Sequence, residues 1–403
     1  MKYILILGDG MADCPVDILK GKTPLEVASK PFIDGLQKSS EIGLVKTIPD
    51  GMKPGSDIAN LSVLGYDPVR YYTGRSPLEA LNMGIDLQPG DIAVRANLVT
   101  LDGGGDYDSL IMADYSAGEI STAEAKILVK YINKKLGTDK ISFYNGVSYR
   151  HCMVVTNSEL GSDLTPPHDI SGRKIGGYLP KGVNGKLFDE IMRNSYELLN
   201  NHPVNVRRRA EGKKPANSLW LWGEGVRPTL VPFQSIYGKR GAVISAVDLL
   251  KGIAKAAGMG VYEVKGATGT INTNFAGKAN AALKALIHDG YDFVYLHIEA
   301  PDECSHQKDL DGKIKSIELI DSKIVKRIAN GMKKAGLEYS MLLLPDHPTP
   351  LKTGTHSSEP VPYMLFRSAD NSYHDRAYCE KSAEKSGVRI NSGMELMNRF
   401  MSR

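Results

Sequence analysis

Acidic side chains and histidines follow three short apolar runs of the sequence, where they could together bind charged groups. They are Asp9, Asp302, Asp346 and His347, with His306 four residues after Asp302 and His356 nine residues after His347. In open α/β sheets, ligands bind at the edge where the carboxyl ends of the parallel strands meet. We therefore expect these six side chains to lie close together at one edge of a sheet.

Carboxylates and imidazoles form a mixed ligand set for divalent ions such as Mn²⁺, Mg²⁺ or Zn²⁺. Six candidate ligands exceed the four that a tetrahedral ion needs, so the pattern predicts two ions. Each residue alone has an ordinary alternative: Asp9, between two glycines, could hold a turn, and Asp302 could cap a helix. Acids at the ends of three apolar runs are harder to explain in this way, and we favour the metal interpretation.

Ser56 follows Gly55 and precedes the apolar pattern of a helix. One interpretation is that Ser56 or Asp57 caps this helix. The other is that Ser56 is a nucleophile whose hydroxyl a metal ion activates, with the helix N-terminus favouring a phosphate added to it. Spacing alone does not separate the two.

The apolar runs that carry these residues have the character of buried parallel strands, because no polar residue alternates within them. They span residues 3–7, 293–298 and 341–344, and a fourth candidate strand spans 242–247. Apolar residues spaced three or four apart predict helices over 276–287 and from 314 to 332. Strands that alternate with helices indicate an α/β fold with a mostly parallel sheet flanked by helices.

The middle of the chain has a different pattern. Ser121 and Glu124 form a capping-box motif that predicts a helix ending at Gly137, and apolar alternation occurs over 92–98 and 153–155. The segment 162–179, rich in Pro, Gly and His, is predicted to be a functional loop. These features predict an inserted α+β domain.

The simplest domain division is therefore one α/β domain interrupted by an insertion. We expect residues 1–70 and 233–403 to form the metal-binding α/β domain, and residues 71–232 to form the second, inserted domain.

Composition limits the classes of function. The 403 residues carry a net charge of +4 and 24% charged residues, which does not suggest a nucleic-acid surface. The four cysteines stand far apart, as expected in a reducing cytoplasm. The apolar run at the N-terminus is too short for a signal peptide, and no stretch approaches a membrane span. We expect a cytoplasmic protein that binds a small molecule rather than nucleic acid or membrane.

Together these motifs resemble the alkaline phosphatase superfamily and, within it, the archaeal type of cofactor-independent phosphoglycerate mutase. The motifs are Gly8-Asp9-Gly10, Gly55-Ser56-Asp57, Ala300-Pro301-Asp302 with His306, Asp346-His347 and Thr353-Gly354-Thr355-His356. The resemblance covers nearly the whole chain. It implies one metal site of Asp302, His306 and His356, a second of Asp9, Ser56, Asp346 and His347, and Ser56 as the residue that takes a phosphoryl group.

The resemblance implies that the inserted domain, residues 71–232, grips the substrate. Candidate substrate-binding residues follow from the resemblance and from charge. Arg95 resembles a family arginine, whereas Arg150, Asp163 and His168 resemble family positions more loosely. Arg208 is a candidate clamp for a carboxylate or phosphate, although a solvated loop also explains the run of arginines around it. Lys239, before the predicted strand at 242, is a candidate phosphate contact or an ordinary surface lysine.

The resemblance implies that the chain interconverts 3-phosphoglycerate and 2-phosphoglycerate through a phosphoserine, with a small phosphorylated hydroxy acid as substrate. Two alternatives stay open. The chain could transfer phosphate to another hydroxy acid, as a homoserine kinase does, although no P-loop or kinase motif is present. It could also be a metal-binding protein that has lost catalysis, although the intact Ser56 and ligand set argue against this.

Overall fold

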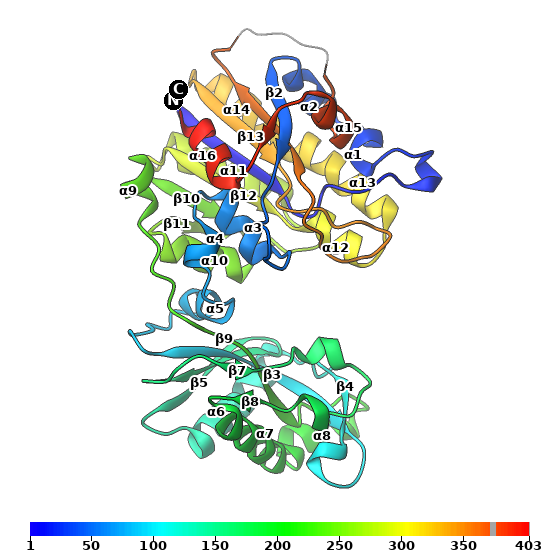
Figure 1. The fold of residues 1–403 in the computed structure, drawn as a ribbon, viewed down its shortest axis with the longest axis vertical. Coiled ribbons are helices and arrows are strands. Elements are labelled where there is room, and N and C mark those ends of the chain that lie inside the picture. Colours follow the sequence, from blue (N-terminus) through cyan, green and yellow to red (C-terminus); the bar gives the residue numbers. More distant parts are fainter. Residues whose placement is uncertain (371–375, 403) are drawn as a thin grey trace. The chain divides into compact units, whose positions relative to one another are not determined.

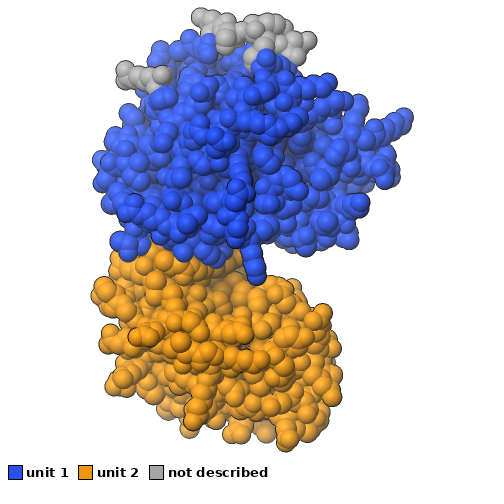
Figure 2. Space-filling view, in the orientation of Figure 1, with its two compact units in different colours: residues 1–72, 229–403 blue, residues 73–228 orange. Residues whose placement is uncertain are grey.

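The computed structural model describes residues 1–370 and 376–402. The chain divides into two compact units (Figure 2). Unit 1 consists of Met1–Tyr72 and Thr229–Arg403, and unit 2 of Thr73–Pro228. These limits lie within a few residues of the boundaries expected from the sequence.

Unit 1 is built on an eight-stranded sheet (Figure 1). In order across the sheet, the strands are β11 (Gly260–Tyr262), β10 (Gly241–Ile244), β12 (Phe293–Ile298), β1 (Lys2–Gly8), β13 (Tyr339–Leu344), β14 (Val361–Arg367), β2 (Ser40–Val45) and β15 (Arg389–Ile390). The strands from β11 to β13 are mutually parallel, and β14 runs antiparallel to both of its neighbours. The mostly parallel sheet predicted from the sequence is confirmed.

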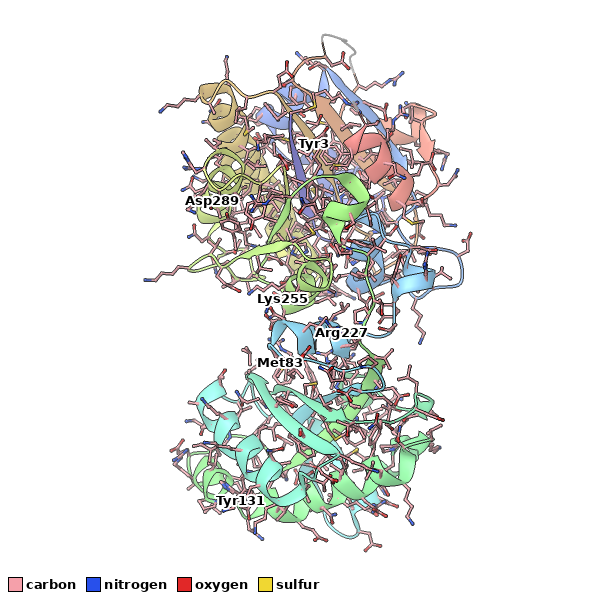
Figure 3. All side chains as sticks on the ribbon, turned by 90° about the vertical axis from the view of Figure 1, so that its left-hand side faces the viewer. Tyr3, Met83, Tyr131, Arg227, Lys255 and Asp289 are labelled. Carbon is pink, nitrogen blue, oxygen red and sulfur yellow. The ribbon has the colours of Figure 1, made fainter. Side chains whose placement is uncertain are left out.

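Helices cover both faces of this sheet, which explains why its central strands are apolar throughout. They are η1 (Asp17–Leu19), α1 (Pro24–Val27), α2 (Pro31–Gln37), α3 (Ser56–Val63), α4 (Pro68–Tyr71), α9 (Phe233–Tyr237), α10 (Asp248–Ala256), α11 (Phe275–Ile287), α12 (Ala300–His306), α13 (Leu310–Leu319), η5 (Ile320–Val325), α14 (Lys326–Lys334), α15 (Glu380–Lys385) and α16 (Gly393–Met401). On one face, Ile4 and Ile6 of β1 share a core cluster with residues of α11 and α14. On the other, Tyr3, labelled in Figure 3, packs edge-on against Phe400 of α16.

Two elements of unit 1 differ from the sequence prediction. The helix predicted from residue 314 to 332 is not regular, because α13 and α14 are joined by the π-helical turn η5. The strand predicted over 242–247 ends at Ile244, since the Ser245 hydroxyl accepts a hydrogen bond from the backbone N–H of Val247 and turns the chain.

Unit 2 has an antiparallel sheet with helices packed on it, so the predicted α+β character is confirmed. Its strands are β3 (Ile92–Asp102), β4 (Ile111–Asp114), β5 (Ile141–Val147), β6 (Arg150–Val155) and β9 (Ser218–Val226), with a separate pair of β7 (Ser162–Asp163) and β8 (Lys181–Gly182). Its helices are α5 (Ser76–Asn82), η2 (Tyr107–Ser109), α6 (Thr122–Leu136), η3 (Pro167–Ile170), η4 (Gly176–Tyr178), α7 (Gly185–Asn200) and α8 (Pro203–Ala210). The Ser121 side chain caps α6, as predicted, by accepting from the N–H of Glu124.

The core of unit 2 lies on two sides of its sheet. The larger cluster, including Trp220 and Phe188, lies between the sheet and helices α6 and α7. A smaller cluster around Cys152 lies on the opposite side, where Met83 (Figure 3) packs against it. In the described part of the chain, no helix has the length and apolar character needed to cross a membrane.

Candidate metal and nucleophile site

Three adjacent strands of unit 1 bring the predicted ligands to one edge of its sheet. β1 pairs in parallel with β12 on one side and β13 on the other, so the three carboxyl ends coincide. Asp9 follows β1, Asp346 and His347 follow β13, and Asp302 lies in α12, directly after β12. All four side chains are buried. The sheet therefore gathers these residues as the sequence predicts.

One part of the site consists of Asp302, His306 and His356. The Nε2 atom of His306 lies 3.0 Å from Oδ2 of Asp302 and 3.1 Å from Nε2 of His356. The Nε2 atom of His356 is also 3.6 Å from Oδ1 of Asp302. Two imidazoles and a carboxylate thus present their ligand atoms to one another.

The other part contains Asp9, Ser56, Asp346 and His347. The Nε2 atom of His347 lies 3.1 Å from Oγ of Ser56, 3.4 Å from Oδ2 of Asp346 and 3.6 Å from Oδ1 of Asp9. His347 also lies close enough to Asp302 and His356 to share a metal-ligand group with them. The two groups implied by the resemblance are therefore contiguous, with His347 between them.

The charges in this cluster suit a cation. Burial, together with the nearby carboxylates of Asp346 and Asp302, raises the pKa of Asp9 well above its usual value. Its Oδ1 atom is buried and has no hydrogen-bond partner among the described residues. A buried carboxylate oxygen with no partner is costly, and a bound metal ion satisfies it. The donor set thus fits divalent metal ions.

Ser56 is not the cap of its helix. The N-cap of α3 is Gly55, and Ser56 is the first residue of the helix. The side chain of Asp57 instead turns to the backbone N–H of Ile58 and to the hydroxyl of Tyr72. Ser56 therefore directs its hydroxyl to Nε2 of His347, in the arrangement that the nucleophile interpretation requires.

Sequence reasoning missed several residues that support the ligands. Asn60, one turn after Ser56 on α3, donates from Nδ2 to Oδ2 of Asp346 (2.9 Å) and to the carbonyl of Ser56 (2.7 Å). The hydroxyl of Tyr295 donates to the side-chain oxygen of Asn60. A polar residue at this spacing from Ser56 on a buried helix was a signal that could have identified Asn60.

His297 supports Asp9 in a similar way. Its Nε2 atom lies 3.0 Å from Oδ2 of Asp9, and its Nδ1 atom lies 3.2 Å from the hydroxyl of Ser245. Burial, with a contribution from the nearby Lys278, lowers the pKa of His297 well below its usual value, so the ring is neutral. A histidine inside an otherwise apolar strand was the available signal in the sequence.

In unit 2, Arg95 belongs to a cluster of cations and aromatic rings. Its guanidinium stacks 4.1 Å from the ring of Trp222 and pairs with Glu79 at 3.2 Å, and burial lowers its pKa to about 10. The charges of Arg75 and Arg150 act on Arg95 at close range. The structure thus brings Arg150 near Arg95, and it adds Arg75, which sequence reasoning missed.

His168 lies at the border of this cluster. Its ring is edge-on to Trp222 at 5.3 Å, and burial lowers its pKa. Trp222 is only partly buried and contacts both Arg95 and His168. Asp163 is exposed in the short strand β7.

Two predicted substrate residues, Arg208 and Lys239, do not lie where a substrate contact would require them. The buried guanidinium of Arg208 donates to Glu124 and to the carbonyls of Ala117 and Lys214, all at 2.8 Å. These bonds hold α8 to its neighbours inside unit 2. We therefore assign Arg208 to the packing of that unit rather than to substrate binding.

Lys239 lies at the wrong edge of the sheet for a phosphate contact. It precedes β10 and stacks over the ring of Tyr3, at the amino end of β1. Asp9 is six residues further along the same strand direction, about 20 Å away at the usual rise per residue. A residue that precedes a parallel strand lies at the amino edge of the sheet, whereas the candidate ligands lie at the carboxyl edge. The prediction for Lys239 is therefore wrong.

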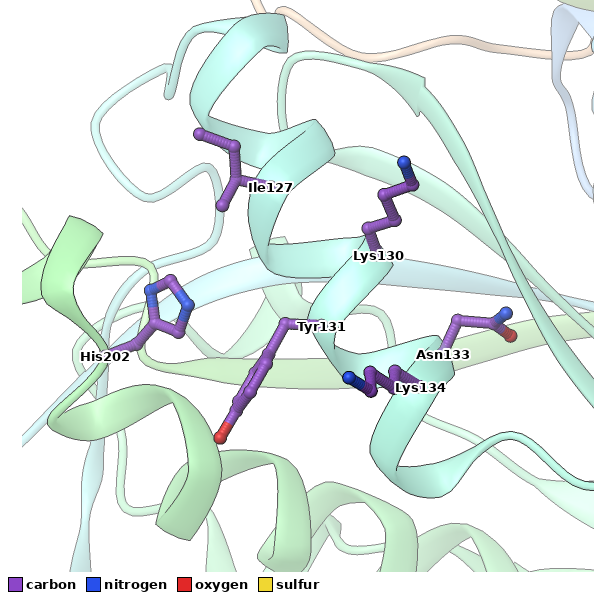
Figure 4. Close-up of a pocket in the computed structure, with 6 residues that line it drawn as sticks. All are labelled: Ile127, Lys130, Tyr131, Asn133, Lys134 and His202. Carbon is purple, nitrogen blue, oxygen red and sulfur yellow. The ribbon is translucent and has the colours of Figure 1, made fainter.

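A separate hollow lies on the surface of unit 2 (Figure 4). It has a volume of about 500 Å³ and is lined by Ile127, Lys130, Tyr131, Asn133, Lys134 and His202. None of the predicted site residues belongs to it. The chemistry predicted from the sequence is therefore not located there.

A fold and site of this kind define an α/β protein suited to metal-dependent chemistry, and comparison with known proteins gives its family. Residues 38–205 match the family model of 2,3-bisphosphoglycerate-independent phosphoglycerate mutase. A probable 2,3-bisphosphoglycerate-independent phosphoglycerate mutase from Geobacter sulfurreducens is 50% identical over 404 residues, which covers 100% of both chains. The corresponding mutase from Methanosarcina barkeri is 48% identical over 98% of each chain.

Solved structures agree with these sequence relatives. The PH0037 protein from Pyrococcus horikoshii has a TM-score of 0.81 and 31% identity, covering 99% of this chain and 96% of its own. The cofactor-independent phosphoglycerate mutase from Thermoplasma acidophilum has a TM-score of 0.66 and 26% identity, covering 100% and 99%. The chain therefore belongs to the family of 2,3-bisphosphoglycerate-independent phosphoglycerate mutases, and the resemblance found in the sequence is confirmed.

Proposed function

We propose that this enzyme is an isomerase that interconverts 3-phosphoglycerate and 2-phosphoglycerate without added 2,3-bisphosphoglycerate. The observation that supports this best is the position of the Ser56 hydroxyl, 3.1 Å from Nε2 of His347 and beside the carboxylates of Asp9 and Asp346. A hydroxyl at a helix N-terminus beside a set of metal ligands is arranged to accept a phosphoryl group. The family of the chain is consistent with this reaction.

In this proposal, two divalent ions (Mn²⁺, Zn²⁺ or Mg²⁺) are held by the two groups of ligands. Asp302, His306 and His356 hold one, and a second set, Asp9, Ser56, Asp346 and His347, holds the other. Bound ions of this kind lower the pKa of a coordinated hydroxyl and offset the charge of a phosphoryl group.

Ser56 carries the phosphoryl group between the two substrate oxygens. Its Oγ loses its proton and forms a bond to phosphorus as the bond from phosphorus to the C3 oxygen breaks, and the C3 oxygen gains a proton. The bound glycerate then presents its C2 hydroxyl, which loses its proton and bonds to phosphorus as the bond from phosphorus to Oγ breaks, and Oγ of Ser56 regains a proton. The partial positive charge of the α3 N-terminus favours the phosphorylated serine between the two steps.

Unit 2 has the side chains suited to bind the substrate anion. Arg75, Arg95 and Arg150 form a cationic cluster, and a planar guanidinium can hold a carboxylate or phosphate through two hydrogen bonds. In the proposal these residues hold the glycerate while its phosphoryl group is on Ser56, and Asp163 and His168 contribute to the same task. Unit 1 performs the phosphoryl transfer. We place the reaction in the cytoplasm, where the four free cysteines would remain reduced.

The test is an assay of the purified enzyme with 3-phosphoglycerate and metal, without bisphosphoglycerate, followed by rapid quench. We expect formation of 2-phosphoglycerate and a phosphate on the peptide that contains Ser56. Ser56→Ala should lose turnover almost completely, because no other group can carry the phosphate. Ser29→Ala, a change at an exposed position of the same unit away from the ligands, is the matched control and should keep turnover.

Two results would contradict the proposal. Near-normal turnover of Ser56→Ala would remove the phosphoserine. Transfer from ATP to homoserine, in the absence of mutase activity, would show that the enzyme is instead a kinase for a hydroxy acid.

A further inference from the structure

Thr349 lies behind the metal ligands and is completely buried. Its hydroxyl oxygen lies 2.5 Å from Oδ1 of Asp302 and 3.2 Å from Nδ1 of His347. Its backbone N–H donates to the carbonyl of Ala12 (3.2 Å), and its own carbonyl accepts from the buried ammonium of Lys313 (3.0 Å). Every polar atom of Thr349 is therefore bonded to a different part of the site.

These bonds join three of the segments that carry the proposed ligands. Ala12 belongs to the loop after β1, Asp302 to the helix after β12, and Thr349 itself to the loop after β13. Gly10 closes the remaining side: an ideal Cβ on Gly10 would lie 2.6 Å from the Thr349 hydroxyl and 2.4 Å from Oδ1 of Asp302. The hydroxyl is thus buried and closely packed on the side of Gly10 as well.

The proton positions follow from the groups involved. A metal-binding carboxylate only accepts hydrogen bonds, so the single hydroxyl proton of Thr349 is donated to Asp302. The hydroxyl oxygen can then only accept from His347, which requires a proton on Nδ1 of that ring. A neutral imidazole with a proton on Nδ1 has a lone pair on Nε2, the atom that faces Ser56.

We propose that Thr349 is a positioning residue for the reaction: its hydroxyl selects the Nδ1–H form of His347 and fixes the carboxylate of Asp302, so that both ligands are ready to bind metal. The proposal rests on the two metal sites of the proposed function and adds a residue that links them. Supporting residues of this kind commonly change metal affinity by 10- to 100-fold.

Matched substitutions separate the hydroxyl from the rest of the side chain. Thr349→Val keeps the shape and removes the hydroxyl, whereas Thr349→Ser keeps the hydroxyl and removes a methyl group. Affinity for Mn²⁺ and Zn²⁺ is measured by competition with a chelator, and thermal unfolding of the metal-free proteins reports on packing. We expect about a 10- to 100-fold loss of metal affinity in Thr349→Val and at most a few-fold loss in Thr349→Ser.

The comparison between the two variants decides the role. If the role of Thr349 is merely structural, metal affinity should fall in step with the unfolding temperature of the metal-free protein. Thr349→Ser would then bind metal as weakly as Thr349→Val if the two variants unfold at the same temperature. That result, or wild-type affinity in Thr349→Val, would overturn the proposal. Failure of the wild-type protein to bind either metal would instead contradict the proposed function on which this inference rests.

The tautomer of the His347 ring gives a second test, which does not require any substitution at position 349. Metal-free wild-type protein, labelled with ¹⁵N at histidine, is examined by two-bond ¹⁵N–¹H correlation at a pH where the ring is neutral, and His347→Gln assigns the signal. We expect the pattern of an imidazole protonated on Nδ1. A ring protonated on Nε2 would overturn the proposal.

Discussion

His306 and Asp302 hold each other in their charged forms when no metal is bound. The hydrogen bond to Asp302 is the main cause that raises the pKa of His306 to about 9. Burial opposes the ionisation of Asp302, but hydrogen bonds from His306 and His356 outweigh it and keep its pKa well below the usual value. At neutral pH the metal-free His306 therefore carries a proton, and its positive charge stands where the proposed metal ion would be.

Metal binding should release this proton, because an imidazole must be deprotonated to act as a ligand. Below the pKa of about 9 the metal-free His306 carries the proton, so we expect metal affinity to rise with pH up to about 9 and proton release to decline above it. Calorimetric titration with metal in two buffers of different ionisation enthalpy measures the number of protons released. His306→Gln should release fewer. Binding at pH 7 without any proton release would contradict the assignment.

A second titrating residue lies behind the site. Lys278 is fully buried and donates to the carbonyl of His297 at 3.0 Å, and burial lowers its pKa to about 8. The unfolded chain has the higher pKa, so between about pH 8 and pH 10 the unfolded state binds more protons than the folded state. The free energy of unfolding should then increase with pH over this range.

Relative to Lys278→Met, the wild-type protein should gain up to about 3 kcal/mol between pH 8 and pH 10.5 and nothing below pH 8. Urea denaturation of the metal-free proteins across this range measures the difference. Lys323→Met, at an exposed position of the same unit, is the control and should follow the wild type. Parallel curves for the wild type and Lys278→Met would contradict the pKa assigned to this lysine.

The predicted ligands could be found from the sequence because each belongs to a segment that follows a short apolar run, and parallel strands bring such segments to one edge. Thr349 could not, since its importance comes from contacts between segments far apart in the chain. The charge of Arg208 and the arginines beside it suggest a binding residue. Only its bonds to Glu124 and two carbonyls reveal a packing role.

At the scale of elements, the position of the nucleophile depends on two helices that pack without a gap. Gly393, the first residue of α16, lies against α3, and its N–H donates to the hydroxyl of Ser62 at 3.2 Å. An ideal Cβ at Gly393 would lie 2.6 Å from the backbone carbon and oxygen of Ser62. Backbone atoms cannot move aside as the end of a side chain can, so a methyl group here must separate the helices.

We expect Gly393→Ala to lower the free energy of unfolding by about 1–3 kcal/mol and to reduce turnover, because α3 carries Ser56. Urea denaturation and the mutase assay measure the two effects. Gly35→Ala is the matched control: Gly35 lies within α2 with open space around its Cβ position, so alanine should raise the helix stability by up to about 1 kcal/mol. Unchanged stability of Gly393→Ala would show that the two helices adjust freely.

The central strands and long helices were predictable from their apolar patterns, whereas the departures from regular structure were not. Periodicity predicts one helix from residue 314, but the buried carboxylate of Asp321 accepts from the N–H of Ile33 at 2.7 Å, within the π-helical turn. This contact joins residues 288 positions apart, and no local pattern contains it. The antiparallel strand β14 was missed for a similar reason, since strand direction depends on the path of the chain.

At the scale of the whole molecule, the candidate metal ligands all belong to unit 1. Asp9 and Ser56 come from its N-terminal segment, and the other ligands come from the segment after residue 229. Unit 2 is a continuous stretch of chain, residues 73–228, with hydrophobic clusters of its own. Metal should therefore stabilise one unit directly and leave the other to its own packing.

Calorimetry of the full chain should show two unfolding transitions, of which a chelator lowers only one. Ions that bind only the folded state stabilise it by mass action, and at 100 times the dissociation constant the gain of about 2.7 kcal/mol corresponds to roughly 5–10 °C for a unit of this size. The fragment 73–228, expressed alone, should unfold at the temperature of the transition that the chelator leaves unchanged. Asp302→Ala should lower only the other transition and make it less sensitive to the chelator, because it removes a ligand from one of the two proposed metal sites. Equal shifts of both transitions on metal removal would mean that the two units unfold together, which would contradict the independence of unit 2.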